Sequence, residues 1–257
     1  MSAAPPAAST FDHAAIDHLV ILADTLDQGV AWAEATLGVT PGPGGEHPMF
    51  GTHNRLLAMS GPGFACCYLE IIAINPEAAR ASGSRADGTK RWFDMDDATL
   101  QAQVRQLGPR LIHWVARVPD VAAASAQLAA LGLDRGPVRA ATRMTPAGEL
   151  RWKITVRDDG QRLLEGCLPT LIEWGATHPA ATMSDSGVQL HQLTLAHPQA
   201  PTLEAALRAA GLAAPLKDAR LQVLAAPMAE LRATLRTPRG PVTLSSLSSS
   251  PLPESLS

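Results

Sequence analysis

The sequence has few of the features that would point directly to a function class. Of its 257 residues, 4% are aromatic and three are cysteine, and the formal net charge is −3 with both signs interspersed. This charge pattern excludes a basic nucleic-acid stripe and a polybasic membrane patch. No apolar run reaches the length of a transmembrane helix. Neither nucleic acid nor a membrane is therefore expected as a partner.

The cysteine content also excludes a disulfide framework. The three cysteines are an odd number, and the adjacent pair Cys66 and Cys67 would rarely bridge. The opening residues, "MSAAPPAAST", have no basic region followed by an apolar run, so no secretory signal is expected. The predicted compartment is a reducing cytoplasm. An apolar fraction of 46% is sufficient for a sizeable core.

The dominant feature that is present is a threefold repeat. In each copy an apolar run leads into a helical pattern, and a glycine, which tolerates left-handed geometry, stops the helix. The runs are 16–23, 111–118 and 190–196, and the glycines are Gly38, Gly132 and Gly211. Strand-like runs follow each helix. Each unit is therefore predicted as β-α-β-β-β, and the fold class as α+β.

The repeat divides the chain into parts. An Arg- and Asp-rich stretch separates the first two units and is predicted as loop and helix, with a lid as one role. The Ser- and Pro-rich end is predicted to fray. The predicted parts are a flexible leader (1–14), module 1 (15–75), an insert (76–110), module 2 (111–176), module 3 (187–247) and a disordered tail (248–257).

Each of the first two units has a histidine on its opening strand and a glutamate on its closing strand. Glu70 follows His18 by 52 residues, and Glu173 follows His113 by 60. A carboxylate among apolar neighbours on its strand face is costly to bury unpaired. Two imidazoles and two carboxylates in one cavity suit a divalent metal such as Zn, Ni, Mn, Co or Fe(II). The alternative is that each histidine is a hydrogen-bonded core residue and that Glu173 faces water.

A glycine-rich segment, "GGEHPMFGTHNR", is predicted to form a substrate rim. Asn54 and Arg55 would hold an anionic or carbonyl group, because guanidinium matches carboxylate geometry. His47 and His53 lie beside them in the sequence. The alternative is an ordinary turn in which Asn54 bonds the local backbone.

These residues resemble a known superfamily. The units with "DHLVILA", "YLEIIA", "HWVARV" and "LIEWG" resemble the vicinal oxygen chelate superfamily, which includes glyoxalase I, the bleomycin-resistance proteins and the extradiol dioxygenases. The segment "HPMFGTHNRLL" followed by "YLEII" resembles proteins with a glyoxalase-like domain. The resemblance implies two modules around a cup, with a metal on the first and last strands of each. The implied ligands, which are similar to the set in bacterial glyoxalase I, are His18, Glu70, His113 and Glu173.

Three functions are consistent with this pattern. The first is a metalloenzyme of the isomerase or lyase type, in which a small substrate chelates the ion and Glu173 by preference, with Glu70, moves a proton. The second is a metal-free protein that sequesters a small compound, with Glu70 or Glu173 paired to an arginine such as Arg55 or Arg117. The third is an iron-dependent ring-cleaving dioxygenase.

The third unit differs from the first two. It has His191 at the position of His18 but no closing glutamate, so it is expected to be structural and metal-free. An odd number of modules leaves one face without a partner, which suggests a symmetric homodimer as a hypothesis. Trp92 and Trp152 are predicted in core or surface packing more than in a pocket wall, and His178 in a loop.

Overall fold

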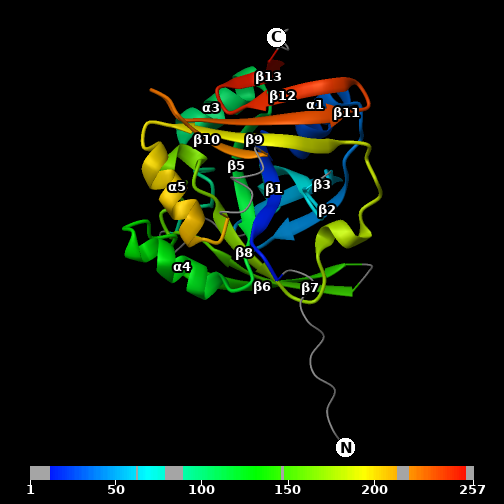
Figure 1. Cartoon of the computed structure of the whole chain (residues 1–257). Coiled ribbons are helices and arrows are strands. Elements are labelled where there is room, and N and C mark those ends of the chain that lie inside the picture. Colours follow the sequence, from blue (N-terminus) through cyan, green and yellow to red (C-terminus); the bar gives the residue numbers. More distant parts are fainter. Residues whose placement is uncertain (1–11, 62, 79–88, 146–147, 213–219, 253–257) are drawn as a thin grey trace, which may run out of the picture.

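The structure is a computed structural model, and it describes residues 12–61, 63–78, 89–145, 148–212 and 220–252. The predicted leader, insert and tail therefore lie partly outside the described residues. Figure 1 shows the elements in chain order. Among the described helices, none is both long and apolar enough to cross a membrane.

The first module has the predicted β-α-β-β-β order. Its helix begins after Thr25, whose side chain accepts a hydrogen bond from the Gln28 backbone N–H, and ends at Gly38 in the left-handed region. Its elements are β1 (Ala15–Leu22), α1 (Leu26–Leu37), β2 (Gly42–His47), β3 (Thr52–Ala58) and β4 (Tyr68–Ile74).

The second and third modules repeat this order. Helix α3 (Ala98–Leu107) lies in the insert between the first two modules. Module 2 contains β5 (Arg110–Arg117), α4 (Val121–Ala130), β6 (Val138–Thr145), β7 (Gly148–Thr155) and β8 (Thr170–Trp174), with a 3-10 turn at Leu163–Gly166. Module 3 contains β9 (Gln189–His197), α5 (Ala200–Ala209), β10 (Leu221–Ala225), β11 (Glu230–Thr237) and β12 (Gly240–Ser245), and a 3-10 turn at Pro179–Thr182 precedes it. The predicted α+β fold of repeated βαβββ modules is confirmed.

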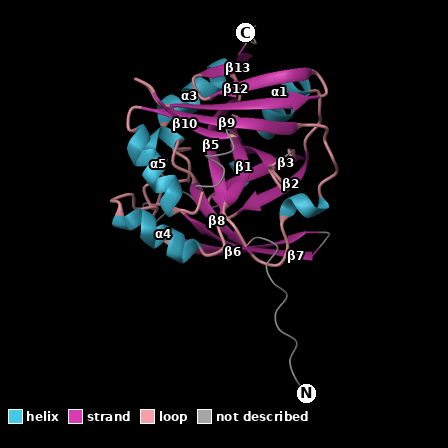
Figure 2. Ribbon diagram, in the orientation of Figure 1, coloured by secondary structure: helices cyan, strands magenta, loops and turns pink. Residues whose placement is uncertain are grey.

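Modules 1 and 2 share one eight-stranded mixed sheet that curls into a half-barrel (Figure 2). The strand order is β2-β3-β4-β1-β5-β8-β7-β6. Each opening strand runs parallel to its closing strand, whereas β1 and β5 are antiparallel neighbours at the centre. The two opening strands, with His18 and His113, are therefore adjacent.

The third module covers the outer face of this sheet. Its five strands, in the order β10-β9-β11-β12-β13, form a second sheet. Strands β11, β12 and β13 contact β5, and Figure 1 shows them crossing over it. Leu193 and Leu231 of module 3 belong to the same buried cluster as Leu19, Leu69 and Trp114. The apolar face that suggested a homodimer is thus buried within the chain.

The chain does not fray directly after β12, as the sequence predicted. Strand β13 (Ser248–Leu252) pairs with β12, with Ser248 opposite Ser245 and Leu252 opposite Thr243. The physical reason is that β12 would otherwise be an open edge with unpaired backbone groups.

Candidate functional site

His18 reaches the inner face of the sheet because of a β-bulge. The pairing of β1 with β5 shifts between Ile16 and His18, so Asp17 is an extra residue in β1. Ile16 consequently packs in the core behind the sheet, and does not share a face with His18 as strict alternation predicted. The bulge also brings Asp17 beside its neighbour, with 2.6 Å between Oδ1 of Asp17 and Nδ1 of His18.

Asp17 is a fully buried carboxylate that holds three side chains. Its Oδ2 accepts a hydrogen bond from Nε1 of Trp174 at 2.9 Å and lies 3.0 Å from Nε2 of His178. Burial acts to raise the pKa of Asp17, but the hydrogen bonds with His178 and His18 outweigh burial and hold the pKa well below its usual range. His178, predicted as a loop residue, does lie outside the strands, but it is buried in this network.

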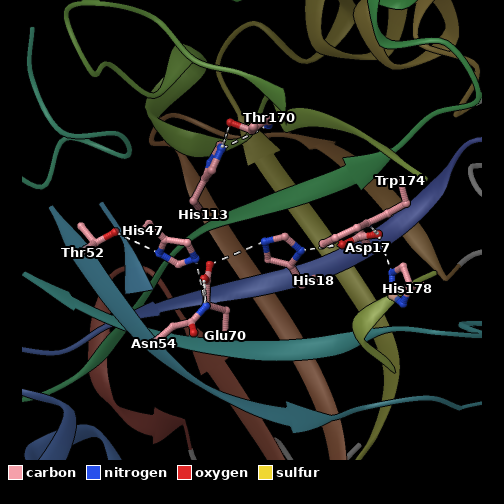
Figure 3. A network of polar contacts seen from close by, with 10 residues as sticks. All are labelled: Asp17, His18, His47, Thr52, Asn54, Glu70, His113, Thr170, Trp174 and His178. Carbon is pink, nitrogen blue, oxygen red and sulfur yellow. Dashed lines mark hydrogen bonds and ion pairs between the residues drawn. The ribbon is translucent and has the colours of Figure 1, made fainter. Parts of the chain in front are cut away.

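Glu70 lies opposite His18 on β4. Its Oε2 is 3.6 Å from Nε2 of His18, and its Oε1 accepts a hydrogen bond from Nδ2 of Asn54 at 2.6 Å. The Oδ1 of Asn54 accepts in turn from the backbone N–H of Gly45 at 2.8 Å, where the pairing of β2 with β3 shifts. Figure 3 shows the carboxylate held between an amide and an imidazole.

His47 extends the network at its other end. Its Nδ1 is 3.1 Å from Oγ1 of Thr52 and its Nε2 is 3.4 Å from Nδ2 of Asn54. Burial lowers the pKa of His47 to about 4; Glu70 opposes this shift, and the Arg143 guanidinium adds to it. His47 is therefore neutral near pH 7. The other two predicted rim residues, His53 and Arg55, alternate with Asn54 along β3 and do not line the cavity.

In module 2, His113 is placed differently. It is fully buried, its Nδ1 lies 3.1 Å from the Gly166 carbonyl oxygen, and its Nε2 accepts from the Thr170 backbone N–H at 3.2 Å. The Thr170 hydroxyl lies 3.0 Å from the same Nε2. Burial, followed by the nearby Arg135, holds the pKa of His113 well below its usual range. Both ring nitrogens are thus engaged, and Figure 3 shows the contact with Thr170 apart from the Glu70 network.

Glu173 is directed away from the cavity. Its Oε1 is 2.7 Å from Nζ of Lys153, and its Oε2 accepts from the Val121 backbone N–H at 3.0 Å, at the start of α4. The next residue, Trp174, lies on the cavity side and donates to Asp17. Alternation along β8 explains the difference. The predicted arginine partners are absent from these contacts, since Arg117 donates to backbone carbonyl oxygens such as that of Ala65.

The described part of the insert fills the space beside His113. The Phe93 ring lies 4.9 Å from the His113 ring and 4.9 Å from the Trp92 ring, measured between centroids. Phe93 and Asp94 both have positive φ, a conformation that strains residues other than glycine. An ion pair of 2.8 Å between Asp94 and Arg162 holds this segment. The insert therefore supplies an aromatic plug, Trp92 and Phe93, to the interior.

The predicted four-ligand metal set does not converge. His18 and Glu70 lie together, whereas the nitrogens of His113 and the oxygens of Glu173 are engaged by protein groups. Within the described ranges, no three His, Cys, Asp or Glu side chains are grouped so that they could hold a metal ion. The donor arrangement therefore does not fit the implied cation.

The His18–Glu70 pair lies in a small cavity of about 40 Å³, which accommodates only a water-sized group. The Tyr68 ring stacks on the His18 ring at 4.5 Å. Burial, with Asp17 and Glu70, raises the pKa of Tyr68 well above its usual range, so its hydroxyl remains a hydrogen-bond donor. The walls are aromatic, contrary to the predicted packing roles of two of the tryptophans. The aromatic lining residues are Tyr68, Trp92, Phe93, Trp152 and Trp174.

Two βαβββ modules that share a curled sheet around a cavity with a His–Glu pair define the vicinal oxygen chelate class. Residues 16–211, well over half of the chain, match the family model described as a glyoxalase-like domain. The chain belongs to this glyoxalase-like domain family. A comparison with curated proteins gave no match.

Solved structures show distant similarity. A hypothetical protein from Staphylococcus aureus is 14% identical with a TM-score of 0.47, and the match covers 84% of this chain and 88% of that one. A methylmalonyl-CoA epimerase from Mycobacterium tuberculosis is 18% identical with a TM-score of 0.35, over 65% of this chain and 91% of that one. The corresponding enzyme from Streptomyces coelicolor is 19% identical with a TM-score of 0.38, over 64% and 96%. At these scores none of them informs the site.

Proposed function

We propose that this glyoxalase-like protein is an enzyme of the isomerase or lyase type, in which His18 and Glu70 move a proton at a small substrate. The observation that supports this most directly is the separation of 3.6 Å between Nε2 of His18 and Oε2 of Glu70 inside an aromatic cavity. A nitrogen base and a carboxylate at this separation can take a proton from one atom of a bound molecule and return it at another.

Each neighbouring residue has a positioning role in this proposal. Asp17 holds His18 with Nδ1 bonded, so that Nε2 faces Glu70. Asn54 binds one oxygen of Glu70 and leaves Oε2 for the substrate. The neutral Tyr68 hydroxyl is a candidate donor to a substrate oxygen that gains negative charge. The preferred proton carrier is therefore Glu70, in place of Glu173.

A metalloenzyme, whether of the isomerase, lyase or dioxygenase type, remains a competing proposal with a defined requirement. His113 would have to give up Thr170, and Glu173 would have to leave both Lys153 and α4. No step of the proposed reaction depends on an ion.

A second candidate function is binding without turnover. It is favoured by the aromatic walls, which would hold a flat compound whether or not a proton is transferred. This candidate and the enzyme proposal agree on the cavity but differ on whether the hydrogen atoms of the ligand exchange with solvent.

Proton exchange in deuterated buffer tests the proposal. Small ketones, 2-oxo acids and 2-hydroxy acids are incubated with the protein, and proton NMR follows loss of the hydrogen next to the carbonyl or carboxyl group. At least one compound should exchange with the wild-type protein. Glu70→Gln should slow that exchange by about 100-fold or more, because a general base typically contributes that much.

Glu173→Gln is the matched control, because it removes the corresponding glutamate of module 2 and keeps its shape. Its exchange rate should stay within about twofold of wild type, since Glu173 does not line the cavity. If a compound binds but does not exchange with wild-type protein, the protein is a binding protein. If Glu173→Gln slows exchange as much as Glu70→Gln, the role assigned to Glu70 alone is wrong.

A further inference from the structure

The small cavity adjoins a much larger groove of about 820 Å³. The groove is lined by the β2–β3 side of module 1 and by residues 182–186. Its lining combines aliphatic and hydroxyl side chains, among them Val39, Thr40, Leu57, Thr182, Met183 and Ser184. The two spaces share four lining residues, which are Leu56, Arg143, Leu150 and Pro179. These four side chains form the boundary between a chamber for a water-sized group and a groove for an extended one.

Arg143 is the only charged residue of this boundary, and its charge is not balanced locally. Its Nε is buried without a hydrogen-bond partner, and no ion pair to it is found in the described part of the chain. Other arginines of module 2 are paired, such as Arg139 with Asp158 at 2.6 Å. A half-buried guanidinium without an acceptor, facing a concave surface, is a site for an anionic group.

The position of Arg143 depends on how far the sheet curls. It lies on β6, one outer strand of the eight-stranded sheet, and β2 is the other outer strand. A Cβ atom added to Gly45 of β2 would lie 2.2 Å from Nη1 of Arg143. The guanidinium therefore bridges the two outer strands directly above the Asn54 amide that binds Gly45. The glycines predicted to form a substrate rim make room for this side chain.

We infer that the site takes a carboxylate with an extended, largely apolar body: Arg143 binds the carboxylate at the boundary, and the body lies in the groove. This inference rests on the proposed use of the chamber as a ligand site. A single guanidinium suits one negative charge, whereas a doubly charged phosphate ester would leave excess charge close to Glu70. The chamber is too small for more than the reacting end of such a molecule.

Calorimetric titration with simple probes tests the inference. The probes are butanoate, octanoate, 1-octanol and octyl phosphate. Octanoate should bind at least tenfold more tightly than butanoate, because the chain enters the groove, and at least tenfold more tightly than 1-octanol. In Arg143→Met the difference between octanoate and 1-octanol should fall to within twofold.

Two further variants locate the effect. Arg139→Met removes the same charge from the same strand outside the groove, and it should keep the full preference for octanoate. Gly42→Phe should reduce octanoate affinity at least fivefold and leave butanoate unchanged. The nearest neighbour of a Cβ at position 42 is 3.6 Å away, so the fold tolerates a side chain there.

Three results would overturn the inference. Equal binding of octanoate and 1-octanol by wild-type protein removes the role of charge. A preference that persists in Arg143→Met assigns the anion to another residue, and tighter binding of octyl phosphate than of octanoate excludes the carboxylate class. Failure of the proposed proton transfer is distinguishable: Glu70→Gln and wild type would then show the same exchange rate while the preference for octanoate remained intact.

Discussion

Modules 1 and 2 begin from the same pattern and end as different kinds of structure. Both carry a histidine on the opening strand and a glutamate on the closing strand, and those strands pair in parallel in both. In module 1 the two side chains meet at 3.6 Å beside a cavity. In module 2 the histidine is enclosed by Gly166 and Thr170, and the glutamate caps a helix. Equivalent positions in a repeat therefore do not imply equivalent chemistry.

The residues around each histidine account for the difference. His18 has carboxylates on both sides, Asp17 and Glu70. His113 instead has a buried cation nearby, because Nη2 of Arg135 donates to Oγ1 of Thr170 at 2.6 Å. In module 2 a guanidinium of the chain itself thus lies near the position where a superfamily member would hold a metal. One half is built around negative charge and the other around positive charge.

The largest expected effect is on stability in module 2. His113→Ala should lower the free energy of unfolding by about 2–4 kcal/mol, because it empties a fully buried site and leaves Thr170 and Gly166 without a partner. Urea denaturation measures this loss. Glu173→Gln, in the same module but partly exposed, should cost less than about 1 kcal/mol. If both variants were as stable as wild type, module 2 would not be the structural half.

A smaller effect should appear in acid, in module 1. The folded-state pKa of Asp17 lies below its unfolded value, so its contribution is fully present above about pH 4 and is lost as the pH falls through the folded value. This contribution is about 2–3 kcal/mol for a shift of this direction and size. Asp17→Asn should therefore flatten the fall in stability between about pH 5 and pH 2.

Asp159→Asn provides the comparison for this experiment. The pKa of Asp159 is also lowered, by a hydrogen bond from Arg157, but this carboxyl is largely solvated in a loop. It should leave the acid profile nearly unchanged. A profile in which Asp159→Asn flattened the curve more than Asp17→Asn would contradict the central place given to Asp17.

The smallest expected effect is that of added metal. Titration of Zn²⁺, Ni²⁺ or Mn²⁺ into chelator-treated protein should show no saturable one-to-one binding and should move the melting temperature by less than about 1 °C. The reason is that His113 and Glu173 are engaged. One-to-one binding that disappears in both His18→Ala and His113→Ala would restore the four-ligand site and remove the contrast between the modules.

The fold could be predicted from the sequence because it is encoded by local patterns that repeat. The apolar runs, the caps and the stop glycines each specify one element, and their order specifies the module. His18, Glu70, His47 and Asn54 were identifiable for the same reason, as polar residues at fixed positions in apolar strands. The repeat also suggested that His113 and Glu173 would join them, which the structure does not show.

The rest of the site depends on contacts between distant segments. The bulge at Asp17 results from the register with β5, and no local pattern marks it. Phe93 and Arg143 reach the cavity from the insert and from the far edge of the sheet. His178 is recruited across 161 positions of sequence by Asp17. Only the dipeptide Asp17–His18 gave a local signal, an acid next to the predicted base.

The packing of module 3 against β5 has a consequence for how this protein behaves on dilution. In an obligate homodimer, a second copy covers the exposed apolar layer, and the folded fraction depends on protein concentration. Here the covering layer is part of the same polypeptide. Folding of that layer is therefore unimolecular, and its melting temperature should be the same in a dilute and in a concentrated sample.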